Sequence, residues 1–390
     1  MSALFKIEQK ILDWVDKYLA VFVMAIITMA GMAVRLPLQE YTSMDAYGFL
    51  LPWYNHILAN GISQQVGDYN FLYQLAIWLM TKLPVEPLIA YKTLSIFFDY
   101  LMAVGTGLLV LGLTKEHRVW KAVLGYGAAL LLPTVVLNSA AWAQCDSIYT
   151  AFAIWALLAF VKEKYPVAMV LLGLSFAFKL QAIFVLPVFL FVYYQRRKFT
   201  VLQFALIPGT MLVAGLPLVF VGRNLLDMFT IYSSQTNTYP YMSMNYPSAW
   251  LLLTHERYQS EFEYLETFAI VLTVAALALM MLVWLKKKVQ AEGENVLIMA
   301  FLLAYTCVLF LPSMHERYAY PVEILAIVLA ILIPKTIPLC AALQGISLCT
   351  YGFYLFNNQA FELPKLAILN ILVYGGYVWY LYRRLLKEKK

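Results

Sequence analysis

Long apolar segments recur along the whole chain, and no other feature of the sequence restricts its fold as strongly. The 390 residues are 63% hydrophobic and 13% charged, whereas soluble domains carry about 25% charged residues. Segments of about 20 apolar residues cross a bilayer as helices, and a single soluble core of the size required here is not expected. The sequence therefore predicts an all-α polytopic membrane protein that forms one integral-membrane domain over residues 1–390.

Hydropathy predicts about twelve transmembrane helices. We expect them at residues 19–36, 89–113, 121–137, 147–161, 165–179, 181–194, 200–221, 266–285, 296–311, 321–334, 336–355 and 365–382. Tight clusters of Lys and Arg follow every second span, as at 196–198 and 286–288. Because such clusters stay on the cytoplasmic side, both termini are predicted to be cytoplasmic. Scarce Asn-x-Ser/Thr sequons, and outer loops that are short apart from 37–88 and 222–265, favour a bacterial plasma membrane.

Two long segments, 37–88 and 222–265, connect spans on the predicted outer side. The first contains the runs AYGFLLPWYNHIL and NFLYQLAIWLM, which are typical of amphipathic helices that lie in the membrane interface. Trp53, Tyr54 and Trp78 in these runs are typical of the aromatic belt at a membrane surface. We therefore expect a roofed chamber at the outer surface.

Polar side chains gather at the predicted outer ends of the spans, although they come from five separate segments. A charge at the centre of a spanning helix costs about 2.5–3.5 kcal/mol on insertion scales, so such groups usually have a partner or a function. Their convergence is typical of a site. The candidates are Asp45 and Asp68 as catalytic carboxylates, and Trp142, Gln144, Asp146, Lys179, Gln181, Asn245, His315, Glu316, Arg317 and Tyr318 as substrate-binding residues.

Several candidates have structural alternatives. Asp45, or Ser43 beside it, and Asp68 are placed to cap the two interfacial helices. Asp146 is placed to cap the fourth span, a role that is compatible with a site. The stretch FKLQ around Lys179 also suits an ordinary tight turn, although a Lys there runs against the charge bias of the outer side.

Two pairs of charged residues also have structural alternatives. Lys92 and Asp99 lie seven residues apart and share a helix face, which favours a structural pair. Glu316 and Arg317 are neighbours, and as a surface ion pair they would contribute less than about 1 kcal/mol.

Taken together, these residue types suit the transfer of a sugar from a membrane phospholipid carrier. Arg and Lys bind phosphate, a carboxylate near a pocket serves as a general base, and aromatic and amide side chains bind sugar rings and hydroxyls. A transporter or flippase of lipid-linked sugars is the alternative, but it would place polar residues across the membrane depth. Asp45, Asp68 and Asp146 could hold a divalent cation, but no DxD motif is present, so we expect no metal and no other cofactor. The net charge of +6 reflects basic loops and does not predict nucleic-acid binding.

Four motifs resemble one family in their order along the chain. They are DAYGFLLPWYNHI, WAQCDS, FKLQAIFVLP and HERYAYP. The layout over about residues 20–325 resembles the C-type (GT-C) integral-membrane glycosyltransferases, and within them the bacterial proteins similar to the eukaryotic GPI-anchor mannosyltransferase II. WAQCDS has Ala143 where that family has Gly, so the turn is expected to have less conformational freedom.

This resemblance implies an inverting hexosyltransferase that uses a polyprenyl-phosphate-sugar donor and a glycan or glycolipid acceptor at the outer face. Asp45 would be the general base and Asp68 the reserve base. Arg317 and Lys179, assisted by His315, would stabilise the departing phosphate. Gln144, Asp146 and Gln181 would orient the sugar or the phosphate. Trp142 would pack the motif turn or stack on a sugar ring.

Overall fold

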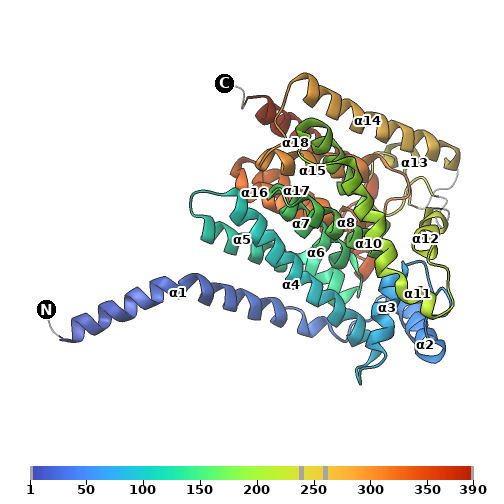
Figure 1. Cartoon of the computed structure of the whole chain (residues 1–390), viewed down its shortest axis with the longest axis horizontal. Coiled ribbons are helices and arrows are strands. Elements are labelled where there is room, and N and C mark those ends of the chain that lie inside the picture. The colour runs from blue at the N-terminus through green and yellow to red at the C-terminus, as the bar shows by residue number, and fades with distance from the viewer. Residues whose placement is uncertain (1–2, 237–240, 258–261, 388–390) are drawn as a thin grey trace.

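The computed structural model describes residues 3–236, 241–257 and 262–387. These residues form helices and connecting turns without an extended strand, so the prediction of an all-α protein is confirmed (Figure 1). The helices follow in the order α1 (Ala3–Ala33), α2 (Leu51–Asn60), α3 (Phe71–Met80), α4 (Pro87–Leu113), α5 (Arg118–Leu130), α6 (Pro133–Val136), α7 (Asp146–Val161), α8 (Tyr165–Phe178), α9 (Leu186–Arg196), α10 (Leu206–Ala214), α11 (Leu216–Phe220), α12 (Asp227–Thr236), α13 (Leu251–Thr254), α14 (Glu266–Lys286), α15 (Glu294–Phe310), α16 (Tyr320–Leu332), α17 (Ile337–Phe356) and α18 (Leu363–Lys387).

Helix length and composition identify a polytopic membrane protein. Among the described residues, five helical segments are long and apolar enough to cross a membrane: Ile7–Leu38, Pro87–Leu113, Val201–Phe220, Glu263–Lys286 and Pro334–Phe356. A sixth is possible if Arg118–Leu130 and Pro133–Ala141, which meet at a bend of 47°, form one span. Several other predicted spans are apolar helices of 10–17 residues. The expected number of twelve therefore stays a prediction.

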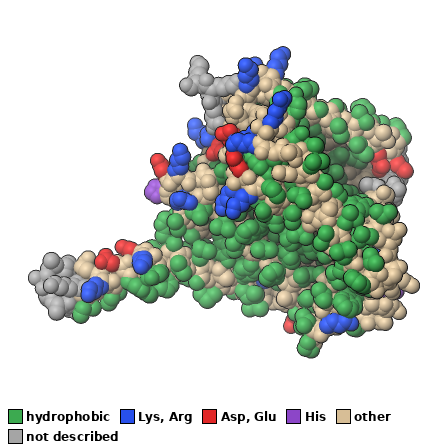
Figure 2. Space-filling view, viewed as in Figure 1, with side chains coloured by type: hydrophobic (Ala, Val, Ile, Leu, Met, Phe, Trp, Pro, Cys, Tyr) green, Lys and Arg blue, Asp and Glu red, His purple; other side chains and the backbone are tan. Residues whose placement is uncertain are grey.

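Burial separates the central helices from those at the edge. In α15 every residue from Asn295 to Leu309 is buried, whereas α14 buries only Ala269, Thr273 and Trp284. A helix that is apolar all round and buried belongs to the interior, and one that is apolar but exposed faces lipid. Accordingly, α14 runs along one edge of the molecule and α1 extends away from its body (Figure 1). Apolar side chains cover most of the visible surface between the ends (Figure 2).

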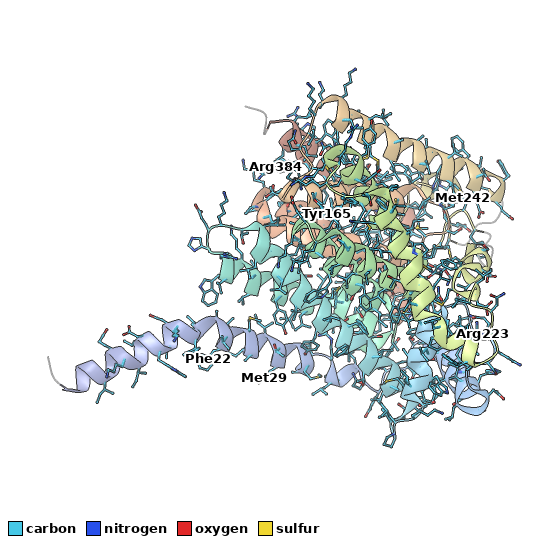
Figure 3. All side chains as sticks on the ribbon, in the orientation of Figure 1. Phe22, Met29, Tyr165, Arg223, Met242 and Arg384 are labelled. Carbon is cyan, nitrogen blue, oxygen red and sulfur yellow. The ribbon has the colours of Figure 1, made fainter. Side chains whose placement is uncertain are left out.

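The charged side chains mark one end of the molecule. Lys and Arg gather over the end that carries the C-terminus (Figure 2), where Arg384 lies, whereas Arg223 and Met242 lie at the opposite side (Figure 3). This asymmetry agrees with the charge pattern from which the two faces were predicted.

Both amphipathic runs of the first long loop form helices, α2 and α3. Neither candidate carboxylate caps them. Asn70 is the N-cap of α3, and its side chain accepts a hydrogen bond from the first helical N–H. Near α2, the Ser43 hydroxyl accepts from the N–H of Ala46 at 3.1 Å, and Asp45 makes no capping bond. The capping roles predicted for Asp45 and Asp68 are therefore wrong.

Candidate active site

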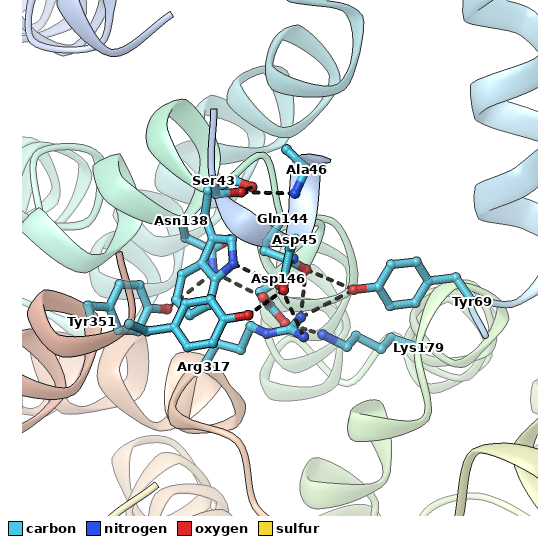
Figure 4. Close-up of polar contacts among 12 residues, drawn as sticks. Ser43, Asp45, Ala46, Tyr69, Asn138, Gln144, Asp146, Lys179, Arg317 and Tyr351 are labelled. Atoms are coloured by element: carbon cyan, nitrogen blue, oxygen red, sulfur yellow. Dashed lines mark hydrogen bonds and ion pairs between the residues drawn. The ribbon is translucent and has the colours of Figure 1, made fainter. Parts of the chain in front are cut away.

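The Asp45 carboxylate is held by three donors from distant parts of the chain (Figure 4). Its Oδ2 accepts from Trp142 Nε1 at 2.9 Å and from Gln144 Nε2 at 2.7 Å. The hydroxyl of Tyr354 on α17 donates to Oδ1. Because both oxygens are bonded, the carboxylate has one defined orientation.

The WAQCDS motif forms the turn between a short π-helical segment (Leu137–Ala141) and α7. Trp142 is fully buried and stacks on Tyr354 with ring centroids 4.5 Å apart. Of the two predicted roles for Trp142, the structure favours packing over sugar stacking, since the ring is covered. Ala143 has φ +63°, a left-handed conformation that suits Gly better than Ala.

Ala143→Gly should stabilise the protein. The left-handed region costs about 1–2 kcal/mol for a residue with a Cβ, and Gly would remove that strain. Gly also has more conformational entropy in the unfolded state, which lowers stability by about 0.5–1 kcal/mol. We expect a net gain of up to about 1 kcal/mol, measured as a higher midpoint temperature. The matched control is Ala141→Gly in the preceding helical turn, which should lower the midpoint. Equal decreases in both variants would contradict the strain at position 143.

Arg317 lies beside Asp45 and bonds to the same motif. Its Nη1 donates to Gln144 Oε1 at 2.6 Å and to the Tyr69 hydroxyl at 3.2 Å. Its Nη2 lies 3.9 Å from Asp45 Oδ2, and the guanidinium is 5.6 Å from the Trp142 ring centroid. Arg317 is 9% exposed, so the earlier alternative of a surface ion pair with Glu316 does not describe it.

Lys179 forms a buried ion pair with Asp146. Asn138 Nδ2 donates to the other carboxylate oxygen at 3.0 Å, so Asp146 bonds side chains and does not cap α7. The Lys179 ammonium also lies 5.3–5.7 Å from three ring centroids, a distance typical of cation–π contacts; the rings belong to Tyr69, Tyr149 and Tyr318.

Two cavities of different character meet at these residues. The first, the polar cavity, has a volume of about 490 Å³. Its polar lining residues are Asp45, Asp68, Tyr69, Gln144, His315, Glu316, Arg317 and Tyr354, and its other lining residues are Phe49, Leu50, Trp53, Gly67 and Met244. The second, the apolar cavity, has a volume of about 230 Å³. Its lining includes the apolar residues Leu180, Ile183, Phe184, Ile270 and Leu311, together with Lys179, Gln181 and Tyr318. The two share Asp68, Tyr69, His315 and Arg317.

Burial shifts the pKa values of His315 and Glu316 in the HERY turn in opposite directions. Removal from bulk water lowers the pKa of His315 well below 6.5, and the charges of Arg317 and Lys179 lower it further. His315 is therefore a neutral imidazole at pH 7 and not a third cation. Burial raises the pKa of Glu316 to about 7 against the opposing effect of Arg317. The nearby Asn245 side chain also opposes this rise in pKa, but neither carboxyl oxygen of Glu316 makes a hydrogen bond of good geometry among the described residues.

Glu316→Gln should flatten the dependence of stability on pH. The ordinary Glu pKa is 4.5 and the folded value is about 7, so the folded state binds the proton more tightly. Its stabilising effect is complete below about pH 4.5 and is lost as the pH rises through 7. The wild-type midpoint temperature should therefore fall more than that of the variant between pH 5.5 and 8. The exposed Glu362→Gln is the control. Parallel curves for wild type and Glu316→Gln would contradict the assignment.

Six of the predicted residues do not line the polar cavity: Trp142, Asp146, Lys179, Gln181, Asn245 and Tyr318. Gln181 lines the apolar cavity. Asn245 is buried, accepts from Arg257 Nε at 2.8 Å, and donates to the Thr350 carbonyl at 3.3 Å. Asn245 therefore supports the wall that its neighbour Met244 lines.

The sequence interpretation missed two site residues. Tyr69 donates to Gln144 Oε1 at 2.8 Å. Its position directly after Asp68 was the only feature of the sequence that could have indicated a site residue there. Tyr354 comes from a helix in which no motif was found.

Comparison with known families now decides the class of protein. The sequence model of glycosyltransferase family 87 matches residues 69–313, more than half of the chain. The chain belongs to glycosyltransferase family 87. Among curated proteins, no sequence matches it. The protein is thus a membrane glycosyltransferase. The matched region contains the WAQCDS and FKLQ motifs of the site. The HERY turn follows just after it, and Asp45 lies before it.

Proposed function

We propose that this glycosyltransferase moves a hexose from a polyprenyl-phosphate-sugar donor to a hydroxyl of an outer-face glycan or glycolipid. The observation that carries the proposal is the wall shared by the two cavities, because Arg317 lies in that wall and Asp45 faces only the polar side. A phosphate group at the wall would leave the sugar beside the carboxylate. In this proposal the site opens at the outer face of a plasma membrane whose cytoplasmic side holds both termini.

The apolar cavity suits the donor. Its aliphatic and aromatic lining, including Ile183, Phe184 and Leu311, matches an isoprenoid chain close to the phosphate. Lys179 is paired closely with Asp146. Arg317 lies 3.9 Å from Asp45, and its Nε has no hydrogen-bond partner among the described residues, so Arg317 is the main cation available to the phosphate. A guanidinium can bind two phosphate oxygens at once, and it would stabilise the negative charge that grows as the phosphate leaves.

The polar cavity suits the acceptor. An acceptor hydroxyl would lose its proton to Asp45 while its oxygen attacks the anomeric carbon, and the bond from that carbon to the phosphate oxygen would break. One displacement of this kind inverts the anomeric configuration. The unpartnered oxygens of Glu316 offer hydrogen bonds to further hydroxyls. The Asp45 carboxylate, which faces only this cavity, favours an uncharged acceptor sugar over a phosphorylated one.

The proposal is tested with purified protein in lipid and a panel of radiolabelled polyprenyl-phosphate hexoses. Transfer to an added neutral glycoside, or slow hydrolysis of the donor, is the expected result. Nucleotide hexoses serve as the control donors and should not react. Transbilayer movement of a labelled donor lipid without turnover would instead support the flippase alternative. Turnover of nucleotide hexoses alone would overturn the donor assignment.

A further inference from the structure

The buried cation Lys92 has no role in the site as described so far. It lies in the second turn of α4, and its side chain is fully buried. The ammonium donates three hydrogen bonds, all to backbone carbonyls of one turn: Leu38 at 2.7 Å, Gln39 at 2.9 Å and Tyr41 at 2.6 Å. It therefore uses all three of its donors on one short stretch of chain.

That stretch leads directly to Asp45. Asp99, seven residues after Lys92 on α4, binds Arg35 at the beginning of the same stretch, with 2.7 Å between Oδ2 and Nη2. The expected Lys92–Asp99 pair is thus replaced by two separate contacts to residues 35–41. A third contact follows at Ser43, whose hydroxyl donates to the Trp142 carbonyl at 3.0 Å.

We propose that Lys92 is a positioning residue for the catalytic carboxylate: by binding the 38–41 turn it fixes where Asp45 stands in the cavity. The Leu38 carbonyl also accepts from the N–H of Tyr41 at 3.2 Å, but without the ammonium the partly buried carbonyls of Gln39 and Tyr41 would lose this donor, and the turn would rearrange to reach others. Asp45 lies four residues after Tyr41, the last residue that Lys92 binds. A displacement of about 1 Å in such a group costs up to about 10²-fold in rate.

The test is a double-mutant cycle with Lys92→Met and Asp45→Asn, read by donor turnover. This readout rests on the proposed function. We expect Lys92→Met to lower kcat about 10- to 100-fold with the donor KM within about twofold. In the Asp45→Asn background the same change should cost less than about threefold, because two residues acting through one group are not additive. Equal losses in both backgrounds, or a loss confined to KM, would overturn the proposal.

A second measurement does not depend on turnover. Hydrogen–deuterium exchange of residues 38–46 should rise in Lys92→Met, and Lys92→Arg should restore part of both the protection and the rate, since it keeps the charge and several donors. The control is Tyr305→Phe, which removes a buried 2.6 Å bond to Asn370 between α15 and α18 and should leave this segment and kcat unchanged. Faster exchange without loss of kcat would show that the contact is dispensable for positioning. Absence of turnover in the wild type would count against the proposed function. In that case, unchanged exchange of residues 38–46 in Lys92→Met would by itself refute the role of the Lys92 contact.

Discussion

Asp45→Asn should slow sugar transfer about 10³-fold while the protein stays folded and keeps its donor. A general base contributes about 10²–10⁴-fold to a rate, and an amide cannot take the acceptor proton, so we expect kcat to fall by about 10³-fold. Donor binding should change little, because Asp45 faces only the polar cavity. Turnover and donor binding by the purified variant in lipid provide the measurement.

The variant also has a structural cost that must be measured beside its rate. Asp45 accepts from Trp142, Gln144 and Tyr354, and the amide of Asn would turn one N–H toward such a donor. An unsatisfied buried group costs about 1–3 kcal/mol, so the midpoint temperature should fall without loss of folding. Asp227→Asn, which only weakens an i,i+4 pair with Arg223, is the control. Normal turnover in Asp45→Asn together with loss in Asp68→Asn would move the base to Asp68, which lies in the shared wall.

Much of this arrangement could be predicted from the sequence because its signals are local. Apolar run length predicts helices, and amphipathic runs predict α2 and α3. The outer ends of adjacent antiparallel spans meet at one face, which is why the WAQCDS, FKLQ and HERY segments were expected together. In the structure Arg317, Gln144 and Tyr69 bond to one another (Figure 4). The Lys179 ammonium, which is paired with Asp146, lies 5.7 Å from the Tyr69 ring centroid.

The rest depends on packing between distant segments, which one sequence does not reveal. Tyr354 reaches Asp45 across 309 positions of chain, and its helix carries no motif. Lys92 and Asp99 were predicted to pair because they share a helix face, but the turn that they bind is fixed only once α1 and α4 are packed. Likewise, the neutral state of His315 follows from its surroundings, since a free imidazole titrates near pH 6.5.

Replacing Arg317 should lower kcat/KM for the donor more than replacing any other residue except Asp45. Arg317→Met removes the guanidinium from the wall between the cavities, so both donor binding and the stabilisation of the departing phosphate are lost. Removal of one preorganised donor of this kind costs about 10²–10³-fold, and we expect kcat/KM for the donor to fall by at least that factor. Equilibrium binding of a non-reactive polyprenyl phosphate should weaken in parallel.

Arg317→Lys distinguishes charge from geometry. Lys keeps the positive charge but loses the planar fork, and it cannot span Gln144 and Tyr69 as the guanidinium does at 2.6 and 3.2 Å. It should therefore restore binding of the polyprenyl phosphate more fully than it restores kcat, since Gln144 also orients Asp45. Arg384→Met, which breaks a partly exposed pair with Glu294 outside both cavities, should change neither quantity. Unchanged binding and turnover in Arg317→Met would remove this residue from the phosphate site and leave Lys179, already paired with Asp146, as the only remaining cation of the apolar cavity among the described residues.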